Sequence, residues 1–340
     1  MIASPKCDTA APHLPPLNFM GDVLCRVSDK FRMKYSIKPG LYRIGNPSQE
    51  SNVLVTANYR LTCNHVRKAM ENRNVHVLVL NTRGINVWCA AGKGTFCTAE
   101  IVRQLTASDL GSKVSHRTLI LPQLSASGVN ASKLHKASGF TIKFGPIRAS
   151  DIPAYLDNNF SATPDMRRVR FSIVDRAKLV PMEAVPALKT LGVFLLIAAI
   201  LFGITRTGII FKQALAGVWP IVVAGLTSVF TGSGLPPLLL PFIPGRAFSF
   251  KGFCTGLIGA VAVFLFLQPV RTDVFLAAFC LVAMPAFSSY QAFLFTGSTT
   301  FTSPSGVKAE LKIALPLYLA GAGISLVLFA AALYRFWRFS

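Results

Sequence analysis

The sequence predicts an α/β domain of Rossmann-like topology followed by an all-α domain of about five transmembrane helices. Short apolar, β-branched runs alternate with helix-length segments in the first half of the chain, an order typical of parallel βαβ units. The second half contains five apolar runs, each near the ~20 residues needed to cross a bilayer, and from Ala187 onward the only acidic residues are Asp273 and Glu310. We therefore expect an N-terminal arm over residues 1–46, a cytoplasmic ligand-binding α/β domain over 47–180 and a transmembrane domain over 181–340.

The first 46 residues are rich in proline and then basic, with Pro5, Pro12, Pro15 and Pro16 near the start. This composition indicates an irregular arm laid over the α/β domain, or a partly disordered tail. Residues 1–20 contain no apolar core of a signal peptide. The seven cysteines show no framework spacing, which favours a reducing, cytoplasmic compartment for this part of the chain.

The α/β domain is expected to alternate strands with helices. The predicted strands are 53–56, 75–80, 117–121, 141–144 and 169–174, and the predicted helices are 63–71, 95–105, 130–137 and 150–156. Parallel strands end at one edge of a sheet, and ligands bind at that edge in open α/β folds. We therefore expect the loops after the strands to line a broad, concave binding surface. Gly145-Pro146 follows the strand 141–144 and belongs to these loops, but it is equally typical of an ordinary turn.

The stretch from Asn86 to Gly94 follows the second strand and contains Cys89 and Lys93. A phosphate-binding P-loop is excluded, because Val87 stands where that pattern needs Gly and Gly94 where it needs Ser or Thr. The spacing to Cys97 also argues against a closed zinc site. Two interpretations of Cys89 stay open, a small buried cysteine and a single thiolate ligand for a metal held by a macrocycle.

The residues Asn86-Val87-Trp88-Cys89-Ala90-Ala91-Gly92-Lys93-Gly94 resemble the cap-helix signature of the HgcA family, the corrinoid proteins of microbial mercury methylation. The likeness extends more distantly to the corrinoid domain of the corrinoid iron–sulfur protein of acetyl-CoA synthesis, which has no cysteine at the matching place. Further family-like segments are 55–59, 121–124, 139–140, 144–148 and 301–306. The resemblance covers roughly residues 40 to 340.

The resemblance implies a cobalamin or related corrinoid cofactor and a methyl group passed from methyl-cobalt to Hg(II), giving methylmercury. It assigns the lower axial position on cobalt to the Cys89 thiolate. We expect Asn86 to fix the loop, Trp88 to pack under the domain, and Lys93 to stabilise the thiolate or remain a solvated lysine. The candidate cofactor-binding residues are Thr56, Asn58, Tyr59, Asn86, Val87, Trp88, Cys89, Ala90, Ala91, Gly92, Lys93, Gln123, Leu124, Ala126, Gly128, Gly145 and Pro146.

Several partners follow from this resemblance. The cysteines of the chain are unclustered, so we expect a ferredoxin-like electron donor with [4Fe–4S] clusters, similar to HgcB, together with a methyl donor protein or methyl-folate system. Basic residues are scattered, which argues against nucleic acid. Two alternatives remain: a corrinoid methyl-carrier of one-carbon metabolism that does not act on mercury, and a membrane protein with a catalytically empty α/β domain.

The transmembrane domain is expected to anchor or dock the protein, because no charged residue lies mid-span. The basic run from Arg167 to Arg170 predicts that the preceding domain faces the cytoplasm. Leu235–Pro241 is expected to be a loop or re-entrant piece, and Trp219, Tyr334 and Trp337 are expected to be interfacial anchors. The predicted spans are 187–205, 214–231, 252–269, 273–295 and 313–334.

Overall fold

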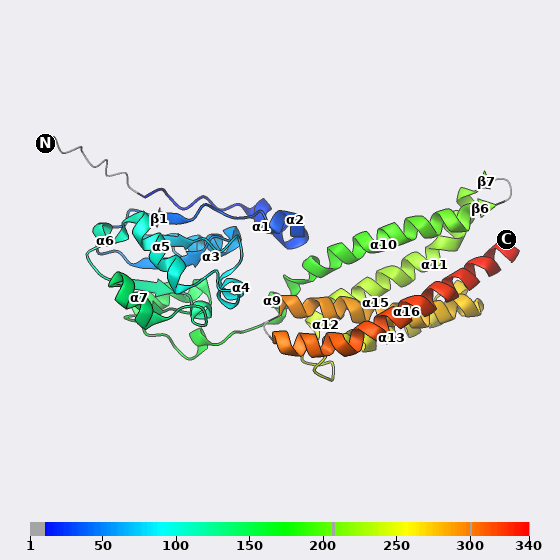
Figure 1. The fold of residues 1–340 in the computed structure, drawn as a ribbon. Coiled ribbons are helices and arrows are strands. Elements are labelled where there is room, and N and C mark those ends of the chain that lie inside the picture. Colours follow the sequence, from blue (N-terminus) through cyan, green and yellow to red (C-terminus); the bar gives the residue numbers. More distant parts are fainter. Residues whose placement is uncertain (1–10, 206–207, 300, 340) are drawn as a thin grey trace. The chain divides into compact units, whose positions relative to one another are not determined.

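The structure is a computed structural model that describes residues 11–205, 208–299 and 301–339. The first ten residues of the predicted arm, Pro5 among them, lie outside the described residues. The chain forms two compact units, Met1–Arg170 and Phe171–Ser340, which Figure 1 shows as an α/β part and a mainly helical part.

The first unit contains a five-stranded sheet of order β1-β3-β2-β4-β5. Its strands are β1 (Gly40–Ile44), β2 (Val53–Ala57), β3 (Val75–Leu80), β4 (Thr118–Leu121) and β5 (Thr141–Phe144). The last four are parallel, and β1 pairs antiparallel with β3 at the edge. The sheet is therefore mixed.

The N-terminal arm is more ordered than expected. It forms α1 (Phe19–Val27), α2 (Asp29–Arg32) and β1. Only Leu41 and Ile44 of β1 are buried, and they lie three residues apart, so the segment lacks the period-two alternation that predicts a strand. The expectation of an irregular arm is therefore wrong for these segments. Pairing with β3 orders β1, and a hydrogen bond from Asn64 Nδ2 to Asp22 Oδ1 at 2.6 Å holds α1.

Helices cover both faces of the sheet. On one face α5 (Thr98–Ser108) and α7 (Ala131–Ser138) pack on alternate residues of β2 and β3, such as Val55 and Leu78. On the other face α3 (Arg60–Ala69) and α8 (Ile152–Asp157) pack on the intervening residues, such as Leu54 and Val77. Both strands are buried throughout, as their continuous apolar sequences require. The remaining short elements are α6 (Leu110–Lys113), η1 (Gln123–Ser125), η2 (Ala149–Asp151) and η3 (Asp165–Arg167).

The predicted last strand over 169–174 is wrong. Val169 and Ile173 are 42% and 54% exposed, and no strand forms there. The segment instead leads into α9 (Ile173–Ala177), whose start is fixed by a capping box between Ser172 and Asp175. The apolar residues of this stretch were read as a strand because a short apolar run has the same pattern in both states.

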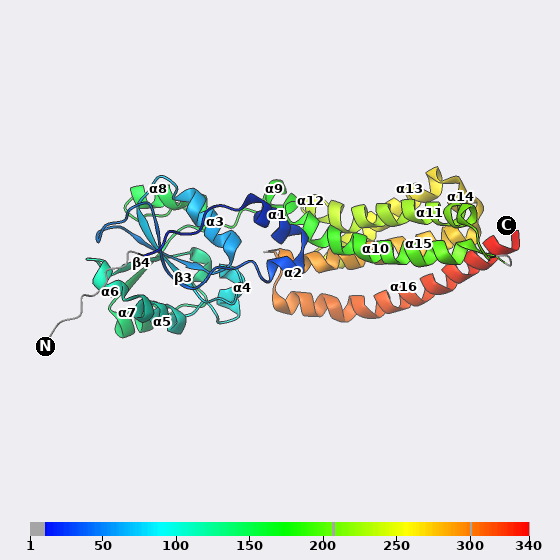
Figure 2. The ribbon, with the colours of Figure 1, turned by 90° about the horizontal axis from the view of Figure 1, so that it is seen from above.

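The second unit is built from long apolar helices, α10 (Val180–Gly203), α11 (Phe211–Val229), α13 (Phe248–Phe266), α15 (Val274–Leu294) and α16 (Pro304–Phe339), drawn from above in Figure 2. Together with their flanking turns they give five segments that are long and apolar enough to cross a membrane by length and composition. Shorter elements connect them: β6 (Ile204–Thr205), β7 (Gly208–Ile209), η4 (Phe230–Gly234), α12 (Leu235–Leu238), α14 (Gln268–Thr272) and η5 (Phe295–Ser298).

The segment Leu235–Pro241, expected to be a loop or re-entrant piece, is helical over 235–238 and a turn over 239–241. Helix α11 continues as a π-helical turn, η4, and then as the short helix α12. Pro236 and Pro237 lie in the first turn of α12, where a missing N–H costs nothing and the fixed φ suits a helix. A high proline content therefore does not exclude a short helix in this segment.

Candidate functional site

The strand order places a topological switch point between β2 and β4, because the chain leaves β2 toward β3 and leaves β4 toward β5. These two strands pair only at Val53–Leu119 and Leu54–Ile120, whereas β2 pairs with β3 along its whole length. Thr56 lies in the part of β2 beyond the last pair. Its hydroxyl is buried and has no hydrogen-bond partner in the described part of the chain.

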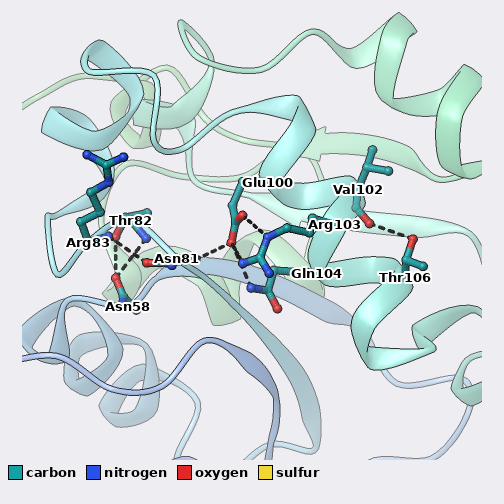
Figure 3. Close-up of polar contacts among 9 residues, drawn as sticks. All are labelled: Asn58, Asn81, Thr82, Arg83, Glu100, Val102, Arg103, Gln104 and Thr106. Atoms are coloured by element: carbon teal, nitrogen blue, oxygen red, sulfur yellow. Dashed lines mark hydrogen bonds and ion pairs between the residues drawn. The ribbon is translucent and has the colours of Figure 1, made fainter.

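Asn58 follows β2 and holds the loop that precedes the signature. Its Oδ1 accepts hydrogen bonds from the Thr82 N–H (3.1 Å), the Thr82 hydroxyl (2.9 Å) and the Gly84 N–H (2.9 Å), as Figure 3 shows in part. Its Nδ2 donates to the Ile37 carbonyl at 3.2 Å. The Asn58 amide, which is buried, is thus engaged within the protein and fixes the end of β3 relative to the end of β2.

Glu100 holds the same loop from α5. Its carboxylate accepts hydrogen bonds from the Asn81 N–H (2.7 Å), Arg103 Nε (2.7 Å) and Gln104 Nε2 (3.0 Å), which Figure 3 also draws. Burial pushes the pKa of Glu100 upward, but the hydrogen bonds from Arg103, Gln104 and Asn81 outweigh it and hold the pKa below its ordinary value. Thr82 and Glu100 were missed from sequence; the turn-forming run Asn81-Thr82-Arg83-Gly84 was the available signal.

The signature forms a short helix, α4 (Val87–Gly92), where a loop was expected, and the next helix begins only at Thr98. Asn86 is its N-cap, and its Oδ1 accepts a hydrogen bond from the Cys89 N–H at 2.9 Å. This confirms that Asn86 fixes the turn, and it places Cys89 in the first turn of α4. Cys89 is partly exposed, and it lies on a different helix from Cys97, which caps α5.

Val87, Ala90 and Ala91 point into the core and anchor α4 on the sheet. Trp88 is 40% exposed, so the expectation that it packs under the domain is wrong. An exposed tryptophan beside a partly exposed cysteine leaves both side chains available at the surface of α4.

The end of α4 is built from small residues. A Cβ added at Gly92 would meet no atom within 4 Å, so there is open space beside this turn. The Lys93 N–H donates to the Cys89 carbonyl at 3.0 Å, and the Lys93 side chain is exposed. Gly94 has a φ of +73°, the left-handed conformation that favours glycine.

The loop after β4 lies against α4. A Cβ at Gly128 would be 2.3 Å from the Phe96 carbonyl oxygen and 3.1 Å from Ala91 Cα, so only glycine permits this close approach. Gln123 accepts a hydrogen bond from Arg167, Leu124 is partly exposed and Ala126 is exposed. Gln123 and Leu124 belong to η1, which contacts α4.

The structure thus brings Asn86, Trp88, Cys89, Gly92 and Lys93 to an accessible edge, next to Leu124 and Ala126. Other candidates lie deeper. Tyr59 is 9% exposed and its hydroxyl donates to Cys25 Sγ of α1 at 3.7 Å, and burial raises the pKa of Tyr59. Gly145 and Pro146 are buried, and the Gly145 N–H donates to the Leu121 carbonyl at 2.8 Å.

Comparison with known proteins connects this unit to acetyl-CoA synthesis. The family described as CO dehydrogenase/acetyl-CoA synthase delta subunit matches residues 29–156. The chain is also similar to gamma subunits of the acetyl-CoA decarbonylase/synthase complex. That of Methanopyrus kandleri is 31% identical over 128 residues, which are 37% of this chain and 27% of that protein. That of Methanocaldococcus jannaschii is 33% identical over 131 residues, 38% of this chain and 26% of that protein.

The α/β unit is related to these subunits. The family match contains the whole candidate site from Thr56 to Pro146. The alignments with the two gamma subunits span only about a quarter of the length of those proteins. The relation therefore concerns this unit, and the helical unit lies outside it.

Proposed function

We propose that this protein is a membrane-anchored corrinoid protein of methyl transfer, with the Cys89 thiolate as the lower axial ligand of cobalt. The observation that carries the proposal is the position of Cys89, partly exposed on α4 at the carboxyl edge of the sheet and one turn after its cap Asn86. When bound, the corrinoid supplies a cobalt centre that accepts and releases a methyl group.

The residues at this edge fit a flat macrocycle with a thiolate below it. The chain beside Cys89 is small, and Gly92 has open space around it, so a ring can approach the helix closely. The buried Thr56 hydroxyl lacks a partner among the described residues, and a polar group of a bound ligand would satisfy it. Asn86 holds the Cys89 backbone, which fixes the position from which the thiolate is presented.

We assign Hg(II) as the methyl acceptor and methylmercury as the product. The support is the cysteine of the signature: an anionic thiolate donates more electron density to a metal than a neutral ligand does, which favours release of a methyl group toward a soft, thiophilic ion. The comparisons favour a second candidate, a corrinoid methyl-carrier of one-carbon metabolism that does not act on mercury, because the related subunits belong to acetyl-CoA decarbonylase/synthase complexes.

The five apolar helices support a place in the cytoplasmic membrane, with the α/β unit on the cytoplasmic side next to the basic run Arg167–Arg170.

Among the described residues no three His, Cys, Asp or Glu side chains form a metal-binding group. We therefore infer that electrons come from a ferredoxin-like [4Fe–4S] partner of the HgcB kind, and the methyl group from a separate donor protein or methyl-folate system.

The test is methylmercury formation in cells that receive Hg(II). Deletion of the gene should abolish it, and the wild-type chain should restore it. Cys89→Ala should not restore it, whereas Cys97→Ala should, because Cys97 is also partly exposed and makes no side-chain cap hydrogen bond. Cys89→His should retain corrinoid but transfer methyl groups much more slowly, because imidazole is a neutral ligand.

The outcomes separate the candidates. Corrinoid in the purified wild-type protein, with a visible spectrum that changes in Cys89→Ala and not in Cys97→Ala, supports the axial thiolate. If corrinoid is bound but deletion leaves methylmercury formation unchanged, the one-carbon carrier is correct. Absence of corrinoid from protein produced in a corrinoid-replete host would overturn both.

A further inference from the structure

The helical unit contains a cavity of about 590 Å³ between α10, α11, α15 and α16, within the ~300–1,000 Å³ range of ligand pockets. Its walls are almost entirely apolar, with Phe194, Phe287, Leu319 and Ala322 among the lining residues. The Ser228 hydroxyl in the wall donates to its own helix at Ala224. Such a wall offers water few partners, so the cavity suits an apolar occupant.

The opening of the cavity follows from the packing of α16. This helix contacts mainly α15, and in Figure 2 it stands off from α10 along its middle. Its most apolar stretch is only 11% buried. The lining residues Leu315 and Leu319 of α16 are 47% and 67% exposed, so the cavity is open along α16, on a surface that faces hydrocarbon if the helices span a bilayer, as the proposed function holds.

The length of the cavity matches one leaflet. Along α16 its lining runs from Leu315 to Ser325, and ten residues of helix rise about 15 Å. On α15 it runs over a similar length, from Phe279 to Tyr290. The hydrocarbon core of a bilayer is about 30 Å thick, so the cavity has the depth of a single acyl chain.

Two lysines lie at one end. Lys189 directly precedes Thr190, the first lining residue of α10, and Lys312 precedes Leu315, the first lining residue of α16, by one turn. Both side chains are exposed, and neither forms an ion pair or a side-chain hydrogen bond in the described part of the chain. The nearby Glu310 is occupied, since it accepts a hydrogen bond from the Ser249 N–H at 2.6 Å.

We propose that this cavity binds one acyl chain of an anionic phospholipid whose phosphate contacts Lys189 and Lys312. Two lysines at the end of an apolar cavity of one-leaflet depth are complementary to a phosphate head group that carries an acyl chain. The lysine stems can lie along apolar surface while the ammonium groups reach the head group. The site holds α16 to α10 through the lipid. It rests on the membrane location within the proposed function, and it requires neither corrinoid nor mercury.

The test uses the full chain in nanodiscs that contain phosphatidylglycerol or phosphatidylcholine, each with a photoreactive diazirine on the acyl chain. Irradiation should label peptides of α16 around 315–325 and of α15 around 279–290, several-fold more with phosphatidylglycerol. The double variant Lys189→Gln/Lys312→Gln should label equally with both lipids, because each basic contact with an anionic surface is lost.

A matched pair of substitutions tests the slot. Ala322 lines the cavity, and Ala320, two residues away on the same helix, is exposed and does not line it. Ala322→Trp should remove most of the labelling, and Ala320→Trp should retain it. Ala322→Leu is a milder filling variant, and circular dichroism checks that each variant folds.

Equal labelling of wild type by the two lipids would overturn the role of the lysines. Equal labelling of folded Ala322→Trp and Ala320→Trp would overturn the slot. Because the readout is independent of methyl transfer, a failure of the corrinoid proposal leaves this result unchanged. Recovery of the wild-type chain in the soluble fraction of cells without detergent would overturn the membrane location and this site together.

Discussion

Asn58 at the end of β2 and Thr82 at the end of β3 are joined by two hydrogen bonds, since Asn58 Oδ1 accepts from both the N–H and the hydroxyl of Thr82 at 3.1 and 2.9 Å. This relationship ties the two strand ends together just before the chain enters α4. The position of Cys89 therefore depends on an amide that lies about thirty residues earlier in the sequence.

Asn58→Ala should loosen the loop before α4. The substitution leaves the buried Thr82 N–H and the Gly84 N–H without their acceptor, and each unsatisfied buried group costs about 1–3 kcal/mol. We expect the free energy of unfolding of the α/β unit to fall by about 3 kcal/mol, and hydrogen exchange to speed up over residues 82–86. Asn81→Ala is the control, because Asn81 is exposed and, within the described residues, its side chain accepts only from the Arg83 N–H. Unchanged exchange in Asn58→Ala would contradict this role.

Gly128→Ala should separate the loop after β4 from α4. The added Cβ meets the Phe96 carbonyl oxygen at 2.3 Å, and backbone must shift, at a cost of about 1–3 kcal/mol. Gly92→Ala is the matched comparison, because its Cβ meets nothing within 4 Å and alanine favours a helix. Thermal unfolding should show a lower midpoint for Gly128→Ala alone. Equal midpoints would show that the loop adapts without strain.

The Glu100 carboxylate should make the loop sensitive to acid. The pKa of Glu100 in the folded protein lies below the ordinary value of 4.5. The ionised carboxylate therefore stabilises the loop fully above pH 4.5. This stabilisation is lost as the pH falls through the lowered pKa of the folded protein. Arg103 is 57% exposed, so the ion pair itself contributes little and the Asn81 N–H contact matters most. Glu100→Gln should flatten the pH dependence of exchange at residues 81–84, and an unaltered pH profile would exclude this assignment.

The cysteines should differ in their reactivity toward iodoacetamide at pH 8. Burial raises the pKa of Cys63 to about 12 and also raises that of Cys25, so both remain protonated and enclosed. Cys89 and Cys97 are both partly exposed and should be alkylated before Cys25 and Cys63 in corrinoid-free protein, with mass spectrometry locating the adducts. Bound corrinoid should protect Cys89 selectively if its thiolate is the axial ligand, and rapid labelling of Cys63 would contradict the packing described.

The sequence by itself determined the parts of this protein that repeat a strong local pattern. The continuous apolar runs of β2 and β3 predicted buried strands, and the five long apolar runs predicted five long helices, because apolar length and period are read directly from composition. The stretch from Asn86 to Gly94 was identified from its place after a predicted strand and from its resemblance to a known cap-helix signature.

Only the tertiary structure decided how those parts meet. β1 exists because β3 offers it an edge, and the predicted strand over 169–174 does not form. Trp88 was expected inside and lies outside, because α4 turns Val87, Ala90 and Ala91 toward the sheet. Asn58 and Glu100 act on one loop from two elements, and hydrogen bonds between residues distant in sequence leave no local period. Tertiary packing therefore fixes which strands pair, which distant side chains form hydrogen bonds and which face of a helix is buried. No single segment of the sequence encodes these features.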